Sequence, residues 1–204
     1  MEDNNIILIG YAGHSYVVYD ILSTMKKKVT HYCDNEEKRN NPFNLTYLGT
    51  ENEALEKIQQ QNFFIAIGDN NIREKIFKAL IIKNASPINA IHATAIISPS
   101  AQVNANGVMI SAGAIINALS CIGKGTIINS GAIVEHDCIV GDFAHIAPGA
   151  VLCGNVSVGK NSFVGAGSVV KQGISIGENV IIGAGSVVVK NVENGKGVKG
   201  NPAK

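Results

Sequence analysis

Residues 110–188 read ISAGAIINALSCIGKGTIINSGAIVEHDCIVGDFAHIAPGAVLCGNVSVGKNSFVGAGSVVKQGISIGENVIIGAGSVV, and this stretch decides the fold of the 204-residue chain. Every sixth residue, from Ile110 to Val188, is Ile, Val or Leu, fourteen times in succession. Because these three residue types make up roughly a fifth of an ordinary protein, chance does not produce such a run. The stretch therefore contains a six-residue repeat, which is typical of a solenoid.

The other positions of the repeat indicate how each six-residue unit is built. The position four residues after the aliphatic one is mostly small, and a glycine recurs every eighteen residues. The small residues are Ala114, Ser120, Thr126, Ala132, Cys138, Ala144, Ala150, Ser162, Ser168 and Ser186, and the glycines are Gly123, Gly141, Gly159 and Gly177. We expect each unit to supply one short strand and one turn, and three units to close one triangular coil with its aliphatic side chains inside. Small residues and glycine suit the tight corners of such a coil.

The two halves of the chain differ in composition. Residues 1–100 hold nine of the eleven aromatic residues and four of the 22 glycines, whereas residues 101–204 hold two aromatic residues and 18 glycines. Only the first half can build a core from large side chains. We therefore predict two domains, residues 1–86 and residues 87–204.

The first half alternates strand and helix patterns. Strands are predicted at residues 6–10, 29–34 and 63–68, and helices at residues 15–25, 51–60 and 71–81. Short apolar runs that end in glycine or a polar residue are typical of buried strands, and apolar residues spaced three and four apart are typical of helices. This alternation predicts a small α/β domain with a short, Rossmann-like parallel sheet.

The composition excludes several classes of function. The chain has 17 Lys and Arg against 16 Asp and Glu, and only Arg39 and Arg73 are arginines, so we expect neither nucleic acid nor an anionic membrane as a partner. No apolar run approaches the roughly 20 residues that span a bilayer. The opening MEDNNIILIG lacks the features of a signal peptide, and the four cysteines show no C-x-x-C spacing. The expected location is therefore the cytoplasm.

The repeat resembles the left-handed β-helix of the hexapeptide acyltransferases. The domain order, the opening GYAGH, the segment VEHDCIVGDFAHIAPGAVLCGNV and the closing VKGNPAK resemble the bacterial UDP-bacillosamine and GDP-perosamine N-acetyltransferases, and nearly the whole chain is covered. The sialic-acid O-acetyltransferases belong to the same broad family. The resemblance implies the left-handed coil, acetyl-CoA as co-substrate, a nucleotide-linked amino sugar as acceptor, and a homotrimer.

A glycine-rich turn, GYAGHS, follows the first predicted strand and leads into a helix. Backbone N–H groups at a helix N-terminus suit phosphate, and G-x-x-G in place of G-x-G-x-x-G disfavours NAD. Polar residues also follow the second and third strands, and the carboxyl ends of parallel strands form one edge that binds ligands. The resemblance places the nucleotide-sugar contacts at Ala12, Gly13, His14, Asp34, Asn35 and Gly68. The alternatives are that the turn is only structural and that Asp34 and Asp69 are turn residues or helix caps.

Three ionisable residues in succession, Glu135, His136 and Asp137, interrupt the mainly apolar sequence of the repeat. Acetyl transfer to an amine needs a base for the proton that the nitrogen releases, and an imidazole suits this near neutral pH. A neighbouring carboxylate can orient the ring, but neighbours on a strand point to opposite faces, so Asp137 needs corner geometry to reach His136. The family resemblance assigns the base to His136 and the assisting acid to Asp137. The alternative is a solvated corner.

The resemblance also assigns the acetyl-CoA contacts. His145 matches a histidine that contacts acetyl-CoA in the family, and Ala166 and Ala184 lie in Gly-Ala-Gly turns expected to contact pantetheine. No metal is expected, because a zinc site in such solenoids needs three converging histidines and the spacing of His92, His136 and His145 does not match. Two further functions stay open: O-acetylation of a sugar such as sialic acid, and a non-catalytic scaffold that binds sugar nucleotides.

Overall fold

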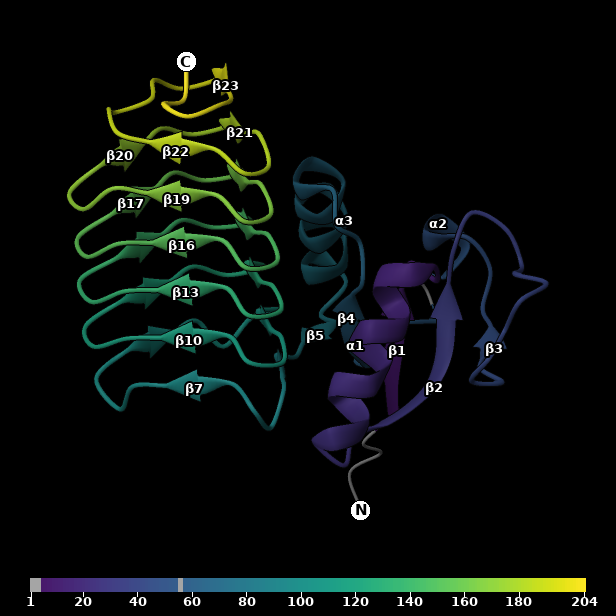
Figure 1. The fold of residues 1–204 in the computed structure, drawn as a ribbon. Coiled ribbons are helices and arrows are strands. Elements are labelled where there is room, and N and C mark those ends of the chain that lie inside the picture. The colour runs from purple at the N-terminus through teal and green to yellow at the C-terminus, as the bar shows by residue number, and fades with distance from the viewer. Residues whose placement is uncertain (1–4, 55–56) are drawn as a thin grey trace.

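The computed structural model describes residues 5–54 and 57–204, which form two units lying side by side (Figure 1). The first unit is a parallel sheet of five strands in the order β3-β2-β1-β4-β5. Its strands are β1 (Asn5–Ile9), β2 (Lys28–Cys33), β3 (Thr46–Tyr47), β4 (Asn62–Ile65) and β5 (Ser86–Pro87), and its helices are α1 (Gly13–Thr24), α2 (Glu51–Ala54) and α3 (Asn70–Ile82). The predicted α/β fold is confirmed, with β3 and β5 as two additional short strands.

Helices α1 and α3 cover opposite faces of this sheet. Ile6 and Leu8 of β1 pack in one hydrophobic cluster with residues of α1, and Ile7 and Ile9 pack in another with residues of α3. Since both faces are covered, the open part of the sheet is the edge where β1, β2 and β4 end. That edge carries the predicted nucleotide-sugar residues.

The helix predicted over residues 51–60 is wrong at its C-terminal end. Only Glu51–Ala54 is helical, residues 57–60 form turns, and residues 55–56 lie outside the described residues. Gln60 has a φ of 61°, which ends any helical path. The turn buries Ile58 completely against the α3 side of the sheet, so core packing overrides the helical pattern of the segment.

The second unit is a parallel β-helix with three sheets. The docking sheet faces the α/β unit, the aliphatic sheet faces the viewer in Figure 1, and the outer sheet closes the triangle. The docking sheet contains β6 (Ala90–Ile91), β9 (Met109–Ile110), β12 (Ile127–Ile128), β15 (His145–Ile146), β18 (Phe163–Val164), β21 (Ile181–Ile182) and β23 (Gly197–Val198). The aliphatic sheet contains β7 (Ile96–Ile97), β10 (Ile115–Ile116), β13 (Ile133–Val134), β16 (Val151–Leu152), β19 (Val169–Val170) and β22 (Val187–Val188). The outer sheet contains β8 (Gln102–Val103), β11 (Cys121–Ile122), β14 (Ile139–Val140), β17 (Ser157–Val158) and β20 (Ser175–Ile176).

The six-residue repeat has the predicted structural meaning. All fourteen aliphatic repeat residues from Ile110 to Val188 point inward and are at most 3% exposed. Strands pair with those one coil away, as Ile133 does with Val151, eighteen residues on. The coil passes from the docking sheet to the aliphatic sheet and then to the outer sheet, and it is left-handed (Figure 1). The left-handed β-helix implied by the resemblance is confirmed.

The small repeat residues line the inside of the corners. Ser120 and Ser162 are fully buried, and their hydroxyls donate to the carbonyls of Glu135 and Gly177 at 2.7 and 2.6 Å. A larger side chain would not fit there, and an unpaired hydroxyl would be costly to bury. Each corner also holds one residue of positive φ. Most are Gly or Asn, and the exceptions between residues 107 and 185 are Leu119, Asp137 and Phe143.

The α/β unit packs directly on the docking sheet. The first sheet ends at β5 with Pro87, and the solenoid begins at β6 with Ala90. Met109 and Ile127 of the docking sheet are buried in the same cluster as Val18 and Leu22 of α1. The first unit therefore covers the N-terminal part of one solenoid face, whereas Ile181 of β21 on the same face is 61% exposed. No helix in the described ranges is long and apolar enough to cross a bilayer.

Candidate functional site

The GYAGHS turn begins helix α1, as the sequence predicts. Gly10 takes a φ of 89° after β1, and the helix begins at Gly13. The carbonyl of Ala12 accepts the N–H groups of Ser15 and Tyr16. Among the described residues no acceptor takes the N–H groups of Gly13 and His14, so they remain available to an anion at the positive end of the helix dipole.

The structure brings five of the six predicted nucleotide-sugar residues into one pocket of about 300 Å³ at the open sheet edge. Its lining residues are Gly10, Tyr11, Ala12, His14, Asp34, Asn35, Ala66, Ile67, Gly68 and Ile72. Gly13 is the sixth predicted residue; it does not line the pocket but lies between Ala12 and His14. Three strand ends that are distant in sequence therefore meet at one cavity.

Asp34 shapes this pocket through its own hydrogen bonds. Its carboxylate accepts the backbone N–H of Tyr11 at 2.8 Å and that of Asn35 at 2.7 Å, and it pairs with Lys38 at 3.1 Å. The carboxylate thus ties the end of β1 to the end of β2. Asp69 instead caps helix α3, accepting the N–H of Ile72 at 2.9 Å, which is the alternative considered for it.

His145 lies on β15 of the docking sheet and faces the α/β unit, only 7% exposed. Its Nδ1 is 3.4 Å from the carbonyl of Gly68, and its Nε2 is 3.2 Å from Nδ2 of Asn129. Because Oδ1 of Asn129 accepts the N–H of Ser130, its Nδ2 must donate to Nε2. The proton of the neutral ring is therefore on Nδ1, which donates to Gly68.

His14, which lines the pocket, lies close to His145 of the solenoid, with 6.4 Å between the ring centroids. Burial, followed by the positive charge of Arg73, lowers the pKa of each ring to about 4. Both are therefore neutral imidazoles near pH 7. Nε2 of His14 is buried and, within the described part of the chain, without a hydrogen-bond partner, so it is free to bond a ligand.

His136 and Asp137 form a hydrogen-bonded pair on the turn between β13 and β14. Nδ1 of His136 is 2.9 Å from Oδ2 of Asp137, and the two side chains are 54% and 52% exposed. Asp137 has a φ of 60°, and this corner conformation turns its side chain toward the ring. Since Nδ1 of a neutral ring donates to the carboxylate, Nε2 carries the lone pair and can accept a proton from a substrate.

The imidazole of His136 lies over Gly154 in the next coil. A Cβ built at Gly154 would come within 2.6 Å of Cε1 and 2.7 Å of Nε2 of this ring. The ring of His136 therefore occupies the space that a side chain at position 154 would need.

The predicted acetyl-CoA residues Ala166 and Ala184 are exposed on the edge between the docking and aliphatic sheets. They lie in successive coils above His145. Among the described residues no acceptor takes their backbone N–H groups, whereas the neighbouring N–H groups of Gly167 and Gly185 bond to Pro148 and Ala166. Free amides one coil apart fit the amide carbonyls of a pantetheine arm.

The candidate residues form two groups on different parts of the solenoid. The pocket, His145, Ala166 and Ala184 lie on or beside the docking sheet. His136 and Asp137 lie on the edge between the aliphatic and outer sheets, the corner of the triangle opposite the docking sheet (Figure 1). One chain by itself therefore keeps the proposed base apart from the proposed sugar pocket.

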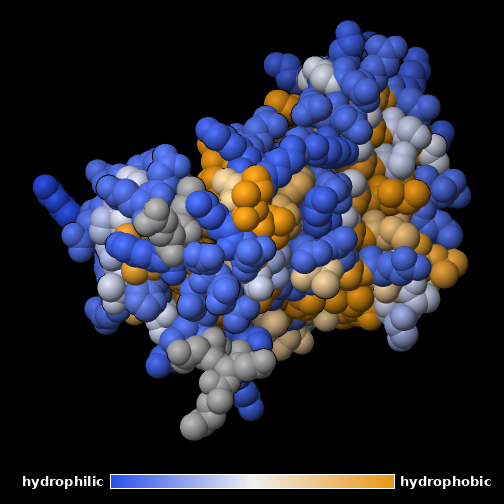
Figure 2. Space-filling view, turned by 180° about the vertical axis from the view of Figure 1, so that it is seen from behind, coloured by the Kyte–Doolittle hydropathy of each residue, from blue (hydrophilic) through white to orange (hydrophobic). Residues whose placement is uncertain are grey.

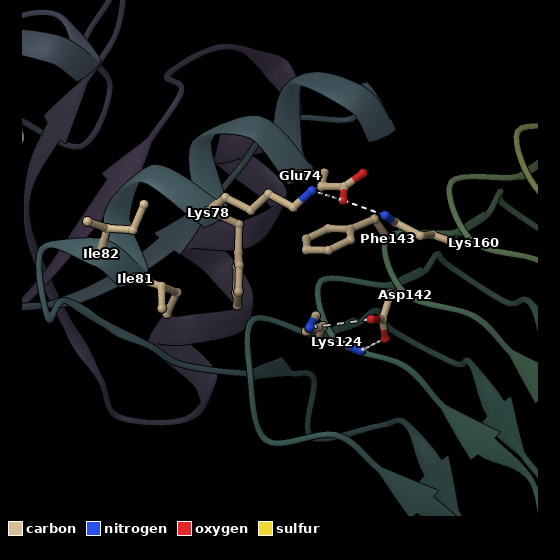
Figure 3. A pocket seen from close by; sticks show the side chains of 9 residues that line it. Glu74, Lys78, Ile81, Ile82, Lys124, Asp142, Phe143 and Lys160 are labelled. Carbon is tan, nitrogen blue, oxygen red and sulfur yellow. Dashed lines mark hydrogen bonds and ion pairs between the residues drawn. The ribbon is translucent and has the colours of Figure 1, made fainter.

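A larger cavity, of about 420 Å³, lies between α3 and the solenoid and contains none of the predicted residues (Figure 3). Glu74, Lys78 and Lys160 form ion pairs across it, and Lys124 pairs with Asp142. Its basic and acidic side chains thus bond to one another. Within residues 5–54 and 57–204, no group of three or more His, Cys, Asp or Glu side chains is placed to hold a metal ion.

Family models match most of the chain in three segments. The PglD N-terminal domain matches residues 5–80, the bacterial transferase hexapeptide (six repeats) matches residues 122–154, and the hexapeptide repeat of succinyl-transferase matches residues 155–190. The matches therefore follow the division into an α/β unit and a solenoid.

Solved structures similar to this chain cover almost its full length. A point mutant of perosamine N-acetyltransferase from Caulobacter crescentus, in complex with CoA and GDP-perosamine, is 37% identical, with a TM-score of 0.94 over 98% of this chain and 95% of that chain. The acetyltransferase domain of PglB from Neisseria gonorrhoeae, in complex with acetyl coenzyme A, is 32% identical, with a TM-score of 0.91 over 98% of both chains. WeeI from Acinetobacter baumannii is 25% identical, with a TM-score of 0.86 over 98% of both chains.

Proposed function

This chain belongs to the hexapeptide-repeat nucleotide-sugar acetyltransferases, and we propose that it transfers the acetyl group of acetyl-CoA to the amino group of a nucleotide-linked 4-amino-deoxy sugar. The observation that carries the proposal is similarity along the whole chain, at 37% identity, to a perosamine N-acetyltransferase whose structure holds CoA and GDP-perosamine. The arrangement of His136 and Asp137 supports the same reaction.

In the proposed reaction His136 is the general base. As the sugar nitrogen attacks the thioester carbonyl, Nε2 of His136 accepts the proton that the nitrogen releases. The carbon–sulfur bond then breaks, and CoA leaves as a thiolate that takes up this proton to become the free thiol. Asp137, 2.9 Å from Nδ1, holds the tautomer in which Nε2 has a lone pair and stabilises the imidazolium that forms. Both side chains are about half exposed, so a bulky substrate can reach them.

The nucleotide sugar is proposed to bind in the pocket at the end of β1, β2 and β4. The unpaired N–H groups of Gly13 and His14 suit its diphosphate, and the neutral ring of His14 offers a further hydrogen bond. Acetyl-CoA is proposed to lie along the edge that carries Ala166 and Ala184, with His145 at the thioester end. Acetyl-CoA and sugar nucleotides are charged and do not cross membranes unaided, so the proposed location is the cytoplasm.

A homotrimer is proposed because the two halves of the site lie on different edges of one chain. The outward residues of the aliphatic sheet are Ile96, Ile115, Ile133, Val151, Val169 and Val187, and Ile96 is 62% exposed. An aliphatic face of this kind is typical of a surface that another subunit covers. The opposite side of the solenoid also carries hydrophobic surface, whereas the α/β unit is mainly hydrophilic there (Figure 2). Three-fold packing of the aliphatic sheets brings the His136 edge of one chain toward the Ala166 edge of its neighbour.

The test is release of free thiol from acetyl-CoA in the presence of UDP-, GDP- and dTDP-linked 4-amino sugars. Free and CMP-linked sialic acid are included as hydroxyl acceptors. We expect thiol release and an N-acetylated product with one of the amino-sugar nucleotides, and turnover at least ~10²-fold lower in His136→Ala. Transfer to sialic acid alone, no transfer at all, or full activity in His136→Ala would each contradict the proposal.

A further inference from the structure

Arg73 is a buried cation in the seam between the two units. Its side chain is on α3 and is 1% exposed. All five of its N–H bonds are used: Nε donates to Gly125 at 2.8 Å, Nη1 to the carbonyls of Ile67 and Gly68 at 3.0 Å each, and Nη2 to Oδ1 of Asn70 and the carbonyl of Phe143 at 2.8 Å each. Every direct acceptor is thus a neutral oxygen.

These acceptors belong to two different parts of the molecule. Ile67 and Gly68 form the rim of the proposed sugar pocket, whereas Gly125 and Phe143 are corner residues of the solenoid. One planar side chain therefore joins the pocket rim to the solenoid, with a geometry that lysine cannot reproduce. The joined rim is also the part that meets His145, since Gly68 accepts from its Nδ1 at 3.4 Å.

Holding the two units together does not by itself require a buried guanidinium. Phe77 and Phe143 pack edge to face across the same seam, and Asn70 donates to the carbonyls of Asn161 and Ser162. Farther out, Glu74 pairs with Lys78 and Lys160, as Figure 3 shows. Burying a charge without a carboxylate partner costs free energy. Contact between the two units therefore does not explain why a charged side chain is buried at position 73.

We infer that Arg73 is a positioning residue for the nucleotide sugar: its guanidinium fixes the Ile67–Gly68 rim of the pocket to the solenoid and so sets the place of this rim relative to His14 and His145. The identity of the positioned substrate rests on the proposed function. The geometry of the rim does not, because it is a property of the free protein.

The charge of Arg73 has a second effect on the same site. It faces both His14 and His145, and after burial it is the next cause of the lowered pKa of each ring. Around them, Asp69 faces Arg73 from the N-cap of α3, while Asn129 and Phe163 on the solenoid are uncharged. Arg73 therefore helps to keep both rings neutral, which leaves His14 and His145 as hydrogen-bonding groups and not as cations.

The test compares Arg73→Met, which removes the charge, with Arg73→Lys, which keeps the charge but not the planar guanidinium with its five N–H donors. We expect both variants to raise KM for the nucleotide sugar at least 10-fold and to leave KM for acetyl-CoA within twofold. In NMR titrations of the free protein, Arg73→Met should raise the pKa of His14 and of His145. Each pKa should stay below that of an exposed histidine, because both rings are still buried. Arg73→Lys should leave them close to wild type.

The matched control is Lys78→Met, on the same helix but in the outer ion pairs, which should change neither KM nor the titrations. If Arg73→Met does not fold, Arg73→Lys alone tests the positioning role. A KM for the nucleotide sugar that stays at the wild-type value in either folded variant would overturn the inference, and so would equal changes in both KM values. If the wild-type protein acetylates no sugar nucleotide, the proposed function fails. The NMR titrations of folded Arg73→Met then still show whether the charge of Arg73 lowers the pKa of His14 and His145.

Discussion

The residue that most closely limits the geometry of His136 is a glycine in the next coil. The ring lies on Gly154, and a methyl group added there would come within 2.6 Å of Cε1. Asp137 holds the ring from the other side, through Nδ1. The position of Nε2 therefore depends on a residue that takes no part in the chemistry.

Gly154→Ala is expected to reduce kcat about 10-fold to 100-fold, because the methyl group displaces the ring from the nitrogen it should deprotonate. The φ of Gly154 is not positive, so the backbone accepts alanine and the fold should persist. Steady-state kinetics and a thermal melt measure the two effects. Gly197→Ala is the control, since its methyl would meet one atom at 4.0 Å. Wild-type kcat in Gly154→Ala would show that the ring tolerates displacement.

The sequence predicted His136 and Asp137 as a pair but not the contact between them. Three adjacent ionisable residues in an apolar repeat are visible in a sequence. The φ of 60° that turns Asp137 toward His136 is a property of the corner, and becomes evident only when the positive-φ position is seen to recur in every unit. Arg73 was missed as a site residue because the helical pattern gives no reason for an arginine beside Ile76 and Phe77. Its rarity, as one of two arginines, was the available signal.

Among the elements, α3 joins the α/β unit to the solenoid through the polar side chains of Asn70, Arg73 and Glu74. Glu74, on the turn of α3 that faces the solenoid, is 11% exposed and pairs with Lys78 at 2.7 Å and with Lys160. It also accepts a hydrogen bond of 2.6 Å from Asn161. Burial alone would raise the pKa of this carboxyl, but the bonds to Lys160, Lys78 and Asn161 outweigh burial and lower the pKa to about 2.

This lowered pKa predicts a pH-dependent contribution of α3 to stability. Because the folded pKa is below the unfolded one, Glu74 stabilises the protein above about pH 4.5, and the contribution is lost as the pH falls toward 2. Glu74→Gln should therefore be less stable than wild type by on the order of 2 kcal/mol at pH 6, with the difference shrinking toward pH 2. Urea unfolding at several pH values measures it. Glu36→Gln, in an exposed pair with Lys38, should show little difference at any pH, and a constant difference for Glu74→Gln would contradict the assignment.

Elements were predicted well where one periodicity dominates and poorly where packing decides. The aliphatic residues at every sixth position from Ile110 to Val188, which point inward, predicted the strands of the solenoid. The segment after Ala54 has a helical pattern, yet Ile58 is buried by a turn. Strands β3 and β5 are as short as the solenoid strands, two residues each, but they belong to no repeat that could reveal them.

At the scale of the whole molecule, the two halves of the proposed site lie on opposite sides of one triangular solenoid. His136 and His145 are nine residues apart, which is one and a half repeat units, so they cannot lie on the same edge. This spacing is visible in the sequence. The packing of the α/β unit on the docking sheet, and not on the other two faces, became evident only in the structure. With the proposed roles of His136 and the pocket, this separation predicts that a productive site joins two chains.

A shared site predicts that two inactive variants restore activity when mixed. His136→Ala lacks the base, and Ala12→Trp fills the sugar pocket, so each alone should lose at least ~10²-fold in turnover. Co-expressed with two different tags and purified through both, they should regain about a third of wild-type activity per chain, because in a trimer that holds both variants one of the three sites draws its base from an Ala12→Trp chain and its pocket from a His136→Ala chain. The control mixture combines His136→Ala with Asp137→Ala, which both damage the part of the site that holds the base. Its turnover should not exceed that of Asp137→Ala alone. If the mixture of His136→Ala and Ala12→Trp is no more active than its parents, base and pocket must act within one chain. The separation of His136 from the pocket would then have to close by a rearrangement of the α/β unit.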